Sequence, residues 1–121
     1  MAVQHLNKRN FKQTMEHNPF VIVDFWATWC EPCVVFKPVF EAASEAYPDV
    51  VFAMVNVDDE PEISSYFHVK QIPALMAVRD QILVDAQVGK MSRSELENAI
   101  QSWAGFDVTD IRRHFSEKAL P

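Results

Sequence analysis

Basic residues and long apolar runs are both scarce in this sequence. Lysine and arginine number 11 against 17 aspartates and glutamates, which leaves a formal net charge of −6 over 121 residues. Nucleic-acid-binding modules usually carry a basic face, so this balance argues against a nucleic-acid partner. No apolar run approaches the roughly 18 residues of a membrane span, and residues 1–5 lack the basic start and apolar core of a signal peptide. We therefore expect a cytoplasmic protein that does not enter a membrane.

Cysteine is also scarce, with only Cys30 and Cys33 in the chain. Reducing compartments keep thiols open, so a lone close pair is not expected to be a structural crosslink in a cytoplasmic protein. A zinc site would need two further ligands. The histidines are scattered and none pairs at ligand spacing: His5, His17, His68 and His114. We therefore expect no metal site.

The cysteine pair lies shortly after the most apolar run of the chain, residues 20–26, which we interpret as a buried strand. Residues 32–47 carry apolar side chains at helical spacing, so the pair lies where a strand leads into a helix. The unpaired N–H groups and the dipole at a helix N-terminus stabilise negative charge. Because the thiolate is the nucleophilic form of cysteine, this position favours redox chemistry at Cys30.

Asp24 is the one acidic residue inside the apolar run. An ionised, unpaired carboxylate in a buried strand costs several kcal/mol. We therefore expect Asp24 to be neutral, linked to water or coupled to function. The alternative is an edge position at which the side chain reaches solvent.

The other segments complete one domain in which strands and helices alternate. Residues 3–6 suggest a short strand, after which Asn7 caps a helix with Phe11 and Met15 on one face. Residues 50–57 suggest a further strand. A strand, a helix and a strand in this order imply a parallel crossover in an α/β sheet.

A hairpin is expected from residues 75–78 and 82–88, followed by Gly89. Its turn contains no glycine, which a two-residue hairpin loop prefers. We therefore expect a longer or less regular turn around residues 79–81.

The last helix of the domain begins with a capping box of Ser92 and Glu95 and ends at Gly105. We therefore assign residues 1–105 to the domain and residues 106–121 to a helical extension.

The extension has Val108, Ile111 and Phe115 on one side of the expected helix. It is expected either to dock on its own domain, to mediate weak self-association of an otherwise monomeric chain, or to bind a partner helix. A lone amphipathic helix needs some surface to cover.

With these elements in place, the chain resembles the thioredoxin family from about Val3 to Trp103. The matching motifs are residues 23–27 before Trp29-Cys30, Pro32-Cys33 after it, Pro38, Val57-Asp58, Ile72-Pro73 and Val88-Gly89. The resemblance implies the thioredoxin fold, an α/β fold with a central mixed β-sheet flanked by helices on both faces. It also implies a cis peptide bond before Pro73, with Pro73 facing the cysteines.

The resemblance further assigns roles to individual residues. Cys30 is the attacking thiol and Cys33 the resolving thiol, with Asp24 as the proton-transfer partner of Cys33 and Pro73 beside the pair. The remaining predicted site residues form the surface that meets the substrate: Trp29, Glu31, Pro32, Ile72, Val88 and Gly89. The expected substrates are protein disulfides, a reductase supplies the electrons, and no cofactor is needed beyond the cysteine pair.

The chain departs from the family pattern at several positions near the pair. Glu31 replaces the usual glycine between the cysteines, and its charge opposes a thiolate on Cys30. Met54 stands where many thioredoxins have a lysine near the buried acid, so Asp24 is expected to stay protonated more readily. The other differences are at Val34, Lys90, His68 and Gln71.

We therefore expect a protein-disulfide reductase that works by dithiol–disulfide exchange. The alternative is a thioredoxin-like module that binds a partner or assists its folding, with minor redox turnover. The altered dipeptide and the added helix motivate this alternative, whereas both intact cysteines argue against it.

Overall fold

The computed structural model describes residues 3–107 and contains a five-stranded sheet and four helices within that range. The elements are β1 (Val3–His5), α1 (Phe11–His17), β2 (Phe20–Trp26), α2 (Glu31–Ala46), β3 (Val51–Asn56), α3 (Pro61–Tyr66), β4 (Ala74–Arg79), β5 (Ile82–Val88) and α4 (Arg93–Ala104). The strand order is β1-β3-β2-β4-β5. Strands β1, β3 and β2 are parallel, whereas β4 and β5 are antiparallel to their neighbours. The expected mixed α/β sheet is confirmed.

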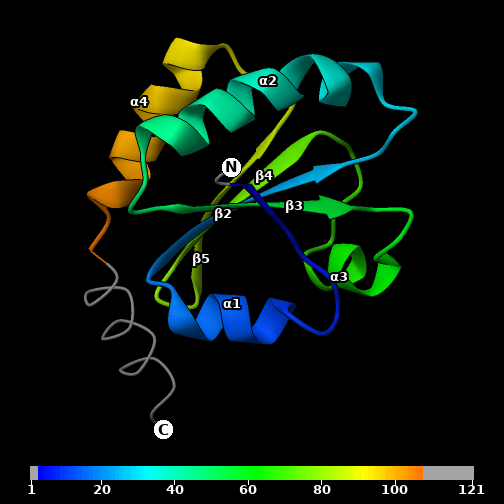
Figure 1. Cartoon of the computed structure of the whole chain (residues 1–121), viewed down its shortest axis with the longest axis horizontal. Helices are drawn as coiled ribbons and strands as arrows, with labels where there is room; N and C mark the ends of the chain where they lie inside the picture. Colours follow the sequence, from blue (N-terminus) through cyan, green and yellow to red (C-terminus); the bar gives the residue numbers. More distant parts are fainter. Residues whose placement is uncertain (1–2, 108–121) are drawn as a thin grey trace, which may run out of the picture.

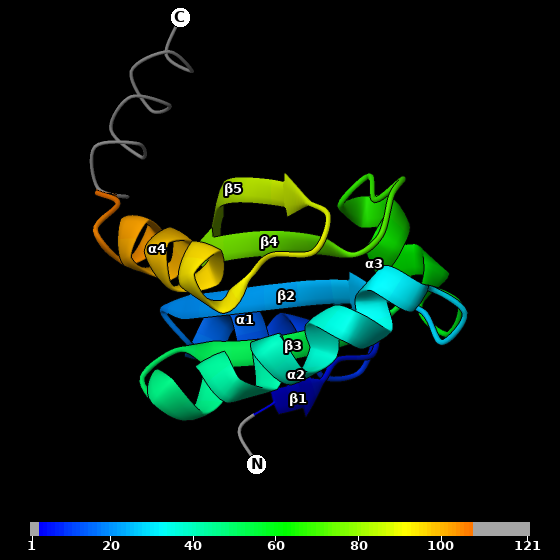
Figure 2. The same ribbon diagram turned by 90° about the horizontal axis from the view of Figure 1, so that it is seen from above.

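Strand β2 lies at the centre of the sheet and is covered on both faces. Helices α2 and α4 lie on one face, and α1 and α3 lie on the other (Figures 1 and 2). Phe20 and Ile22 belong to the core under α2 and α4, whereas Val21 and Val23 belong to the core under α1 and α3. Alternate side chains of an extended strand point to opposite faces, which is why the run is apolar throughout. An edge position for Asp24 is therefore wrong.

The start of α1 differs from the expectation at Asn7. The N-cap position of this helix is Asn10, and its side chain makes no capping hydrogen bond to the helix. The Asn7 side-chain oxygen instead accepts hydrogen bonds from the backbone N–H groups of Arg9 and Asn10. Asn7 thus stabilises the turn before the helix, a local bond that asparagine makes readily. Phe11 and Met15 both pack into the core under α1, as expected.

The hairpin turn is shorter than its sequence suggests. Arg79 pairs with Ile82, so only Asp80 and Gln81 form the loop, with φ angles of 50° and 68°. Positive φ angles at both loop residues are typical of the two-residue type I′ turn, whose twist matches that of the strands. Aspartate tolerates a positive φ better than most residues. The Asp80 N–H also donates to the Pro19 carbonyl at 2.8 Å, which ties the turn to the start of β2. The expectation of a longer turn was wrong, because these contacts hold a two-residue loop without glycine. The hairpin is nevertheless irregular, with a shift in register between Ala77 and Val78.

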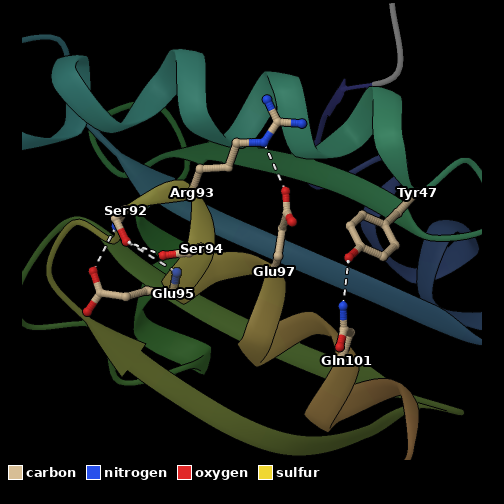
Figure 3. A network of polar contacts seen from close by, with 7 residues as sticks. All are labelled: Tyr47, Ser92, Arg93, Ser94, Glu95, Glu97 and Gln101. Atoms are coloured by element: carbon tan, nitrogen blue, oxygen red, sulfur yellow. Dashed lines mark hydrogen bonds and ion pairs between the residues drawn. The ribbon is translucent and has the colours of Figure 1, made fainter.

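Helix α4 begins as expected from the sequence. Figure 3 shows the capping box, in which the Ser92 side chain accepts from the Glu95 N–H and the Glu95 carboxylate accepts from the Ser92 N–H. Gly105 follows the last residue of the helix, as predicted. At this end of the helix, the Arg79 guanidinium donates to the carbonyls of Trp103 and Ala104 at 2.7 and 2.8 Å. A cation at a helix C-terminus satisfies carbonyls that have no partner within the helix.

Asp85 joins β5 to α4. Its carboxylate accepts from the Trp103 indole N–H at 2.8 Å and from the Gln87 amide at 3.0 Å. Burial alone would raise the pKa of Asp85, but hydrogen bonds from Gln87, Trp103 and the Ala86 N–H outweigh it and lower the pKa. Trp103 is otherwise buried in the core, as the sequence suggested.

The helix expected in residues 106–121 lies outside the described residues, apart from the exposed Phe106 and Asp107. Within residues 3–107, no helix is both long and apolar enough to cross a membrane.

Candidate active site

The two cysteines lie between the carboxyl end of β2 and the first turn of α2, as the sequence predicts. Cys30 is the N-cap residue of α2, and its sulfur accepts a hydrogen bond from the Cys33 backbone N–H at 3.3 Å. The Cys30 carbonyl accepts from the Val34 N–H at 3.1 Å. Cys30 and Cys33 form a disulfide, with their Cα atoms 5.2 Å apart. This geometry places the first sulfur at the positive end of the helix dipole.

The two sulfurs differ in how far they are buried. Cys30 is 5% exposed and Cys33 is 1% exposed. Together with Ala27 they form a small buried cluster, against which Trp26, Val57 and Ile72 pack. An incoming molecule therefore reaches Cys30 more easily than Cys33.

Glu31 and Pro32 occupy the first turn of α2, and both are exposed. Proline is well suited to this turn because the first N–H groups of a helix have no partner within it. Glu31 places a negative charge beside Cys30, the cysteine at the positive end of the helix dipole. The exposure of Glu31 leaves that charge screened by solvent.

Asp24 is fully buried at the middle of β2. It pairs with Met54 of β3 and Leu75 of β4, and these neighbours belong to the core under α2 and α4. Neither carboxylate oxygen has a hydrogen-bond partner within the part of the chain that the structure describes. Burial raises the pKa of Asp24 to about 8, so the carboxyl group is mostly protonated at pH 7. Of the three expected states of Asp24, neutral, linked to water or coupled to function, the raised pKa favours the neutral one.

Ile72 and Pro73 bring a second segment to the cysteines. The peptide bond between them is cis, as the resemblance implied. The Pro73 carbonyl accepts from the Gly89 N–H at 2.8 Å, and Ala74 pairs with Val88 in the sheet. Gly89 has a φ of +99°, a conformation that other residues rarely adopt. The predicted site residues before β4 and at the end of β5 therefore lie together at one end of the hairpin: Ile72, Pro73, Val88 and Gly89.

Trp29 lies beside Cys30 with 69% of its surface exposed. Its indole N–H donates to Asp58 Oδ2 at 2.8 Å. Asp58 belongs to a motif that matches the family, but the resemblance assigns it no role. One signal was available: β2 and β3 are parallel, so residues that follow their carboxyl ends lie at the same edge of the sheet. Asp58 thus holds the exposed indole beside the cysteine pair.

Trp26 carries a further polar group near the site. Its indole N–H is buried and has no hydrogen-bond partner among the described residues. The Lys37 ammonium lies 5.5 Å from the centre of the Trp26 ring, within the range of a cation–π contact. Trp26 is two residues from Asp24, on the same face of β2.

Within residues 3–107, no group of three or more His, Cys, Asp or Glu side chains is placed to hold a metal ion. The site is thus built from two cysteines, a buried acid and an apolar surface.

Residues 2–102 match the thioredoxin family model. The chain is 42% identical over 113 residues to putative thioredoxin 2 of Streptomyces coelicolor, covering 93% of this chain and 84% of that protein. It is 38% identical to a thioredoxin of Alicyclobacillus acidocaldarius, covering 79% of this chain and 92% of that protein. Among solved structures it is similar to Plasmodium falciparum thioredoxin, with a TM-score of 0.77, 29% identity, and coverage of 82% of this chain and 97% of that chain.

Proposed function

Because the chain belongs to the thioredoxin family and is a protein-disulfide reductase that works through a Cys30–Cys33 pair, we propose that Cys30 attacks and Cys33 resolves. The observation that supports this order is the position of the Cys30 sulfur at the N-cap of α2, where it accepts the Cys33 N–H. A thiolate at that position gains from both the hydrogen bond and the dipole. The more deeply buried Cys33 is left for the second step.

Reduction of a substrate disulfide takes two exchange steps. The Cys30 thiolate attacks one sulfur of a substrate disulfide, forming a mixed disulfide and releasing the other substrate sulfur as a thiolate. Cys33 then loses its proton and attacks the Cys30 sulfur, which forms the Cys30–Cys33 disulfide and releases the second substrate thiolate. The substrate gains two electrons, and the chain is oxidised by two.

We propose Asp24 as the group that takes the proton from Cys33. Burial raises the pKa of Asp24 to about 8, close to the ordinary value of about 8.5 for a cysteine thiol. Proton transfer between groups of similar pKa has a free-energy change near zero, so it can run in either direction. At pH 7 about a tenth of the Asp24 carboxyl groups are ionised, and these can accept the proton during resolution and return it when the disulfide is reduced.

The order of attack predicts selective alkylation of the reduced protein. We expect a brief exposure to a small amount of iodoacetamide at pH 7 to modify Cys30 at least about ten times faster than Cys33, because the thiolate reacts and the thiol does not. Peptide mass spectrometry measures the ratio. Modification of both cysteines after unfolding in urea serves as the control, and faster modification of Cys33 in the folded protein would reverse the proposed roles.

We propose that the substrate docks on Trp29, Ile72, Pro73, Val88 and Gly89, with Glu31 and Pro32 at its margin. Trp29 and Val88 are exposed large hydrophobic residues, and Ile72 packs against the cysteine cluster. Apolar side chains around a backbone turn suit an extended peptide segment that carries the disulfide. Pro73 and Gly89 shape that backbone, because they are linked by a hydrogen bond beside the pair.

Glu31 is expected to tune the reactivity of Cys30. In Glu31→Gln, loss of the negative charge should lower the pKa of the Cys30 thiol by a few tenths of a unit, the size expected for two nearby charges in water. It should also make the protein a slightly stronger oxidant, because the reduced form is then favoured. The thiolate absorbance at 240 nm as a function of pH measures the pKa, and equilibration with glutathione measures the potential. Glu31→Gly gives the added effect of flexibility, and equal values in wild type and Glu31→Gln would show that the charge has no role.

The family implies protein disulfides as substrates and a reductase as electron donor. We propose that the protein works in the cytoplasm, where a reducing pool maintains the dithiol.

We also propose that residues 1–105 carry the activity and that one chain suffices, since every proposed site residue comes from this range of a single chain. Cell fractionation tests the location, and sedimentation of the full chain tests whether the active species is a monomer.

A further inference from the structure

A hollow lies on the face of the sheet opposite α2 and α4, between α1, α3 and the hairpin. Its volume is about 420 Å³, and its apolar lining includes Phe11, Met15, Tyr66, Phe67 and Leu83. Phe11 makes edge-to-face contacts with both Tyr66 and Phe67. Tyr66 is nevertheless 73% exposed, and Leu83 is also exposed. The hollow is therefore an apolar surface left open to solvent within the described part of the chain.

This hollow continues toward the hairpin turn. A second hollow of about 330 Å³ shares Met15, Glu16 and Gln81 with the first, and it extends to Pro19 and Asp80. The two together form a groove, which we call the α1 groove. It runs from the aromatic residues of α3 to the turn between β4 and β5.

The described chain ends close to one end of the α1 groove. The Arg79 guanidinium donates to the carbonyls of Trp103 and Ala104 and lies 3.4 Å from that of Phe106. Arg79 directly precedes Asp80, which lines the groove. Phe106, near the end of the described residues, therefore lies beside Arg79, the residue next to Asp80 of the groove.

We propose that residues 108–121 of the same chain bind in the α1 groove. Their sequence carries Val108, Ile111 and Phe115 at the spacing of one helix face, and the groove presents an apolar lining that this face could cover. The segment has three basic residues against two acidic ones, with Arg112 and Arg113 adjacent, and Glu16 lines both hollows whereas Lys12 lines only the first. Fourteen residues span up to about 45 Å when extended and about 20 Å as a helix, so the groove is within reach.

Attachment to the domain favours binding within one chain over binding between chains. A short linker gives the segment an effective concentration on the order of millimolar at its own groove. A second copy would have to compete with that concentration. The alignment with the Streptomyces coelicolor relative covers 113 residues and so extends past residue 107 into this segment.

The end of the α1 groove at the hairpin turn, where the described chain ends, lies at the opposite end of β2 from the cysteines. Phe20, the first residue of β2, pairs with Arg79 beside the groove, whereas Cys30 follows the last residue of this strand. Binding of the segment therefore stabilises the domain without covering the substrate surface around Trp29. Disulfide-reductase activity is expected to be unaffected by loss of this binding.

Photocrosslinking of the full chain tests the proposal. With benzoylphenylalanine at position 115, we expect crosslinks to α1, to residues 66–68 and to residues 81–83, located by mass spectrometry. The same group at Ser116, about 100° around the expected helix from Phe115 and off its apolar face, should give at least about fivefold less product at these sites. Adding Leu83→Asp should lower the yield from position 115 by a similar factor, while insulin reduction shows that the variant is folded and active.

A mixture of ¹⁵N-labelled and unlabelled chains distinguishes the possible occupants. Crosslinks within chains of one isotope composition support the proposal. Crosslinks mainly between light and heavy chains would overturn it in favour of a second copy. Crosslinks elsewhere on the domain, or yields equal at positions 115 and 116, would overturn the assignment of the groove.

Discussion

Cys30→Ser is expected to lower insulin-disulfide reduction with dithiothreitol to the rate of dithiothreitol alone, a loss of at least about a hundredfold in the protein's own turnover. Serine has nearly the same size, so the fold and the docking surface should be retained. Its hydroxyl, however, is not ionised near neutral pH and cannot attack a disulfide. The turbidity of precipitating insulin chains measures the rate. Thr28→Ser, an exposed position in the same loop, is the matched control and should retain full activity.

Cys33→Ser is expected to stop the reaction one step later. Cys30 can still attack, but no thiol remains to resolve the mixed disulfide, so a covalent adduct with the substrate should accumulate. Non-reducing electrophoresis and intact mass detect one substrate per chain, and the double variant Cys30→Ser/Cys33→Ser should form none. Equal turnover by wild type and Cys30→Ser would contradict the proposed mechanism. Such a result would instead favour the partner-binding module with minor redox turnover.

The central part of the fold was predictable because several independent signals agree there. The apolar run of β2, the helical spacing after Pro32 and the crossover to β3 each limit the topology, and the structure confirms all three. The position of Asp24 followed from the same pattern, since only a central strand is apolar on both faces. Its neutrality follows from burial between Met54 and Leu75.

The features that could not be predicted depend on contacts between distant segments. The tight turn at Asp80 and Gln81 is held by a hydrogen bond to Pro19, about 60 residues earlier in the sequence, which no local pattern reveals. The bond from Trp29 to Asp58 joins two loops that meet only once the parallel strands pair. His68 adopts a φ of 56° where the family has glycine, so the backbone conformation is kept without the residue that usually signals it.

The second prediction concerns the free energy of unfolding of Asp24→Asn. The folded protein holds the pKa of Asp24 at about 8, against 3.8 for an ordinary aspartate. Between these values the folded state binds more protons than the unfolded state, so the wild type loses stability as pH rises from about 4 to about 8. The loss is roughly 4 kcal/mol at pH 7 and up to about 6 kcal/mol above pH 8, at 1.36 kcal/mol per pKa unit. Asparagine does not ionise, so the variant should be more stable than wild type by these amounts.

Urea denaturation at several pH values, from 4 to 9, measures this difference. At pH 4 the two proteins should be nearly equal, because a protonated aspartate and an asparagine are both neutral and equally short of hydrogen-bond partners. Asp49→Asn removes an exposed carboxylate and is the matched control for the loss of one negative charge. A stability difference that is the same at pH 4 and pH 9 would show that the Asp24 carboxyl group does not titrate as described.

The same substitution should slow the reaction that the carboxyl group is proposed to assist. Without Asp24 as a proton acceptor, the buried Cys33 must lose its proton directly to solvent. Resolution of the mixed disulfide should therefore become about 10²-fold slower, which is the lower end of the range for general base catalysis. Rapid mixing with a fluorescent disulfide peptide separates formation of the mixed disulfide from its resolution, and only the second step should change. A variant that is both more stable above pH 7 and slower in resolution is the result expected if the buried acid is kept for catalysis at the expense of stability. A more stable variant with unchanged resolution would instead leave Asp24 without a part in the exchange.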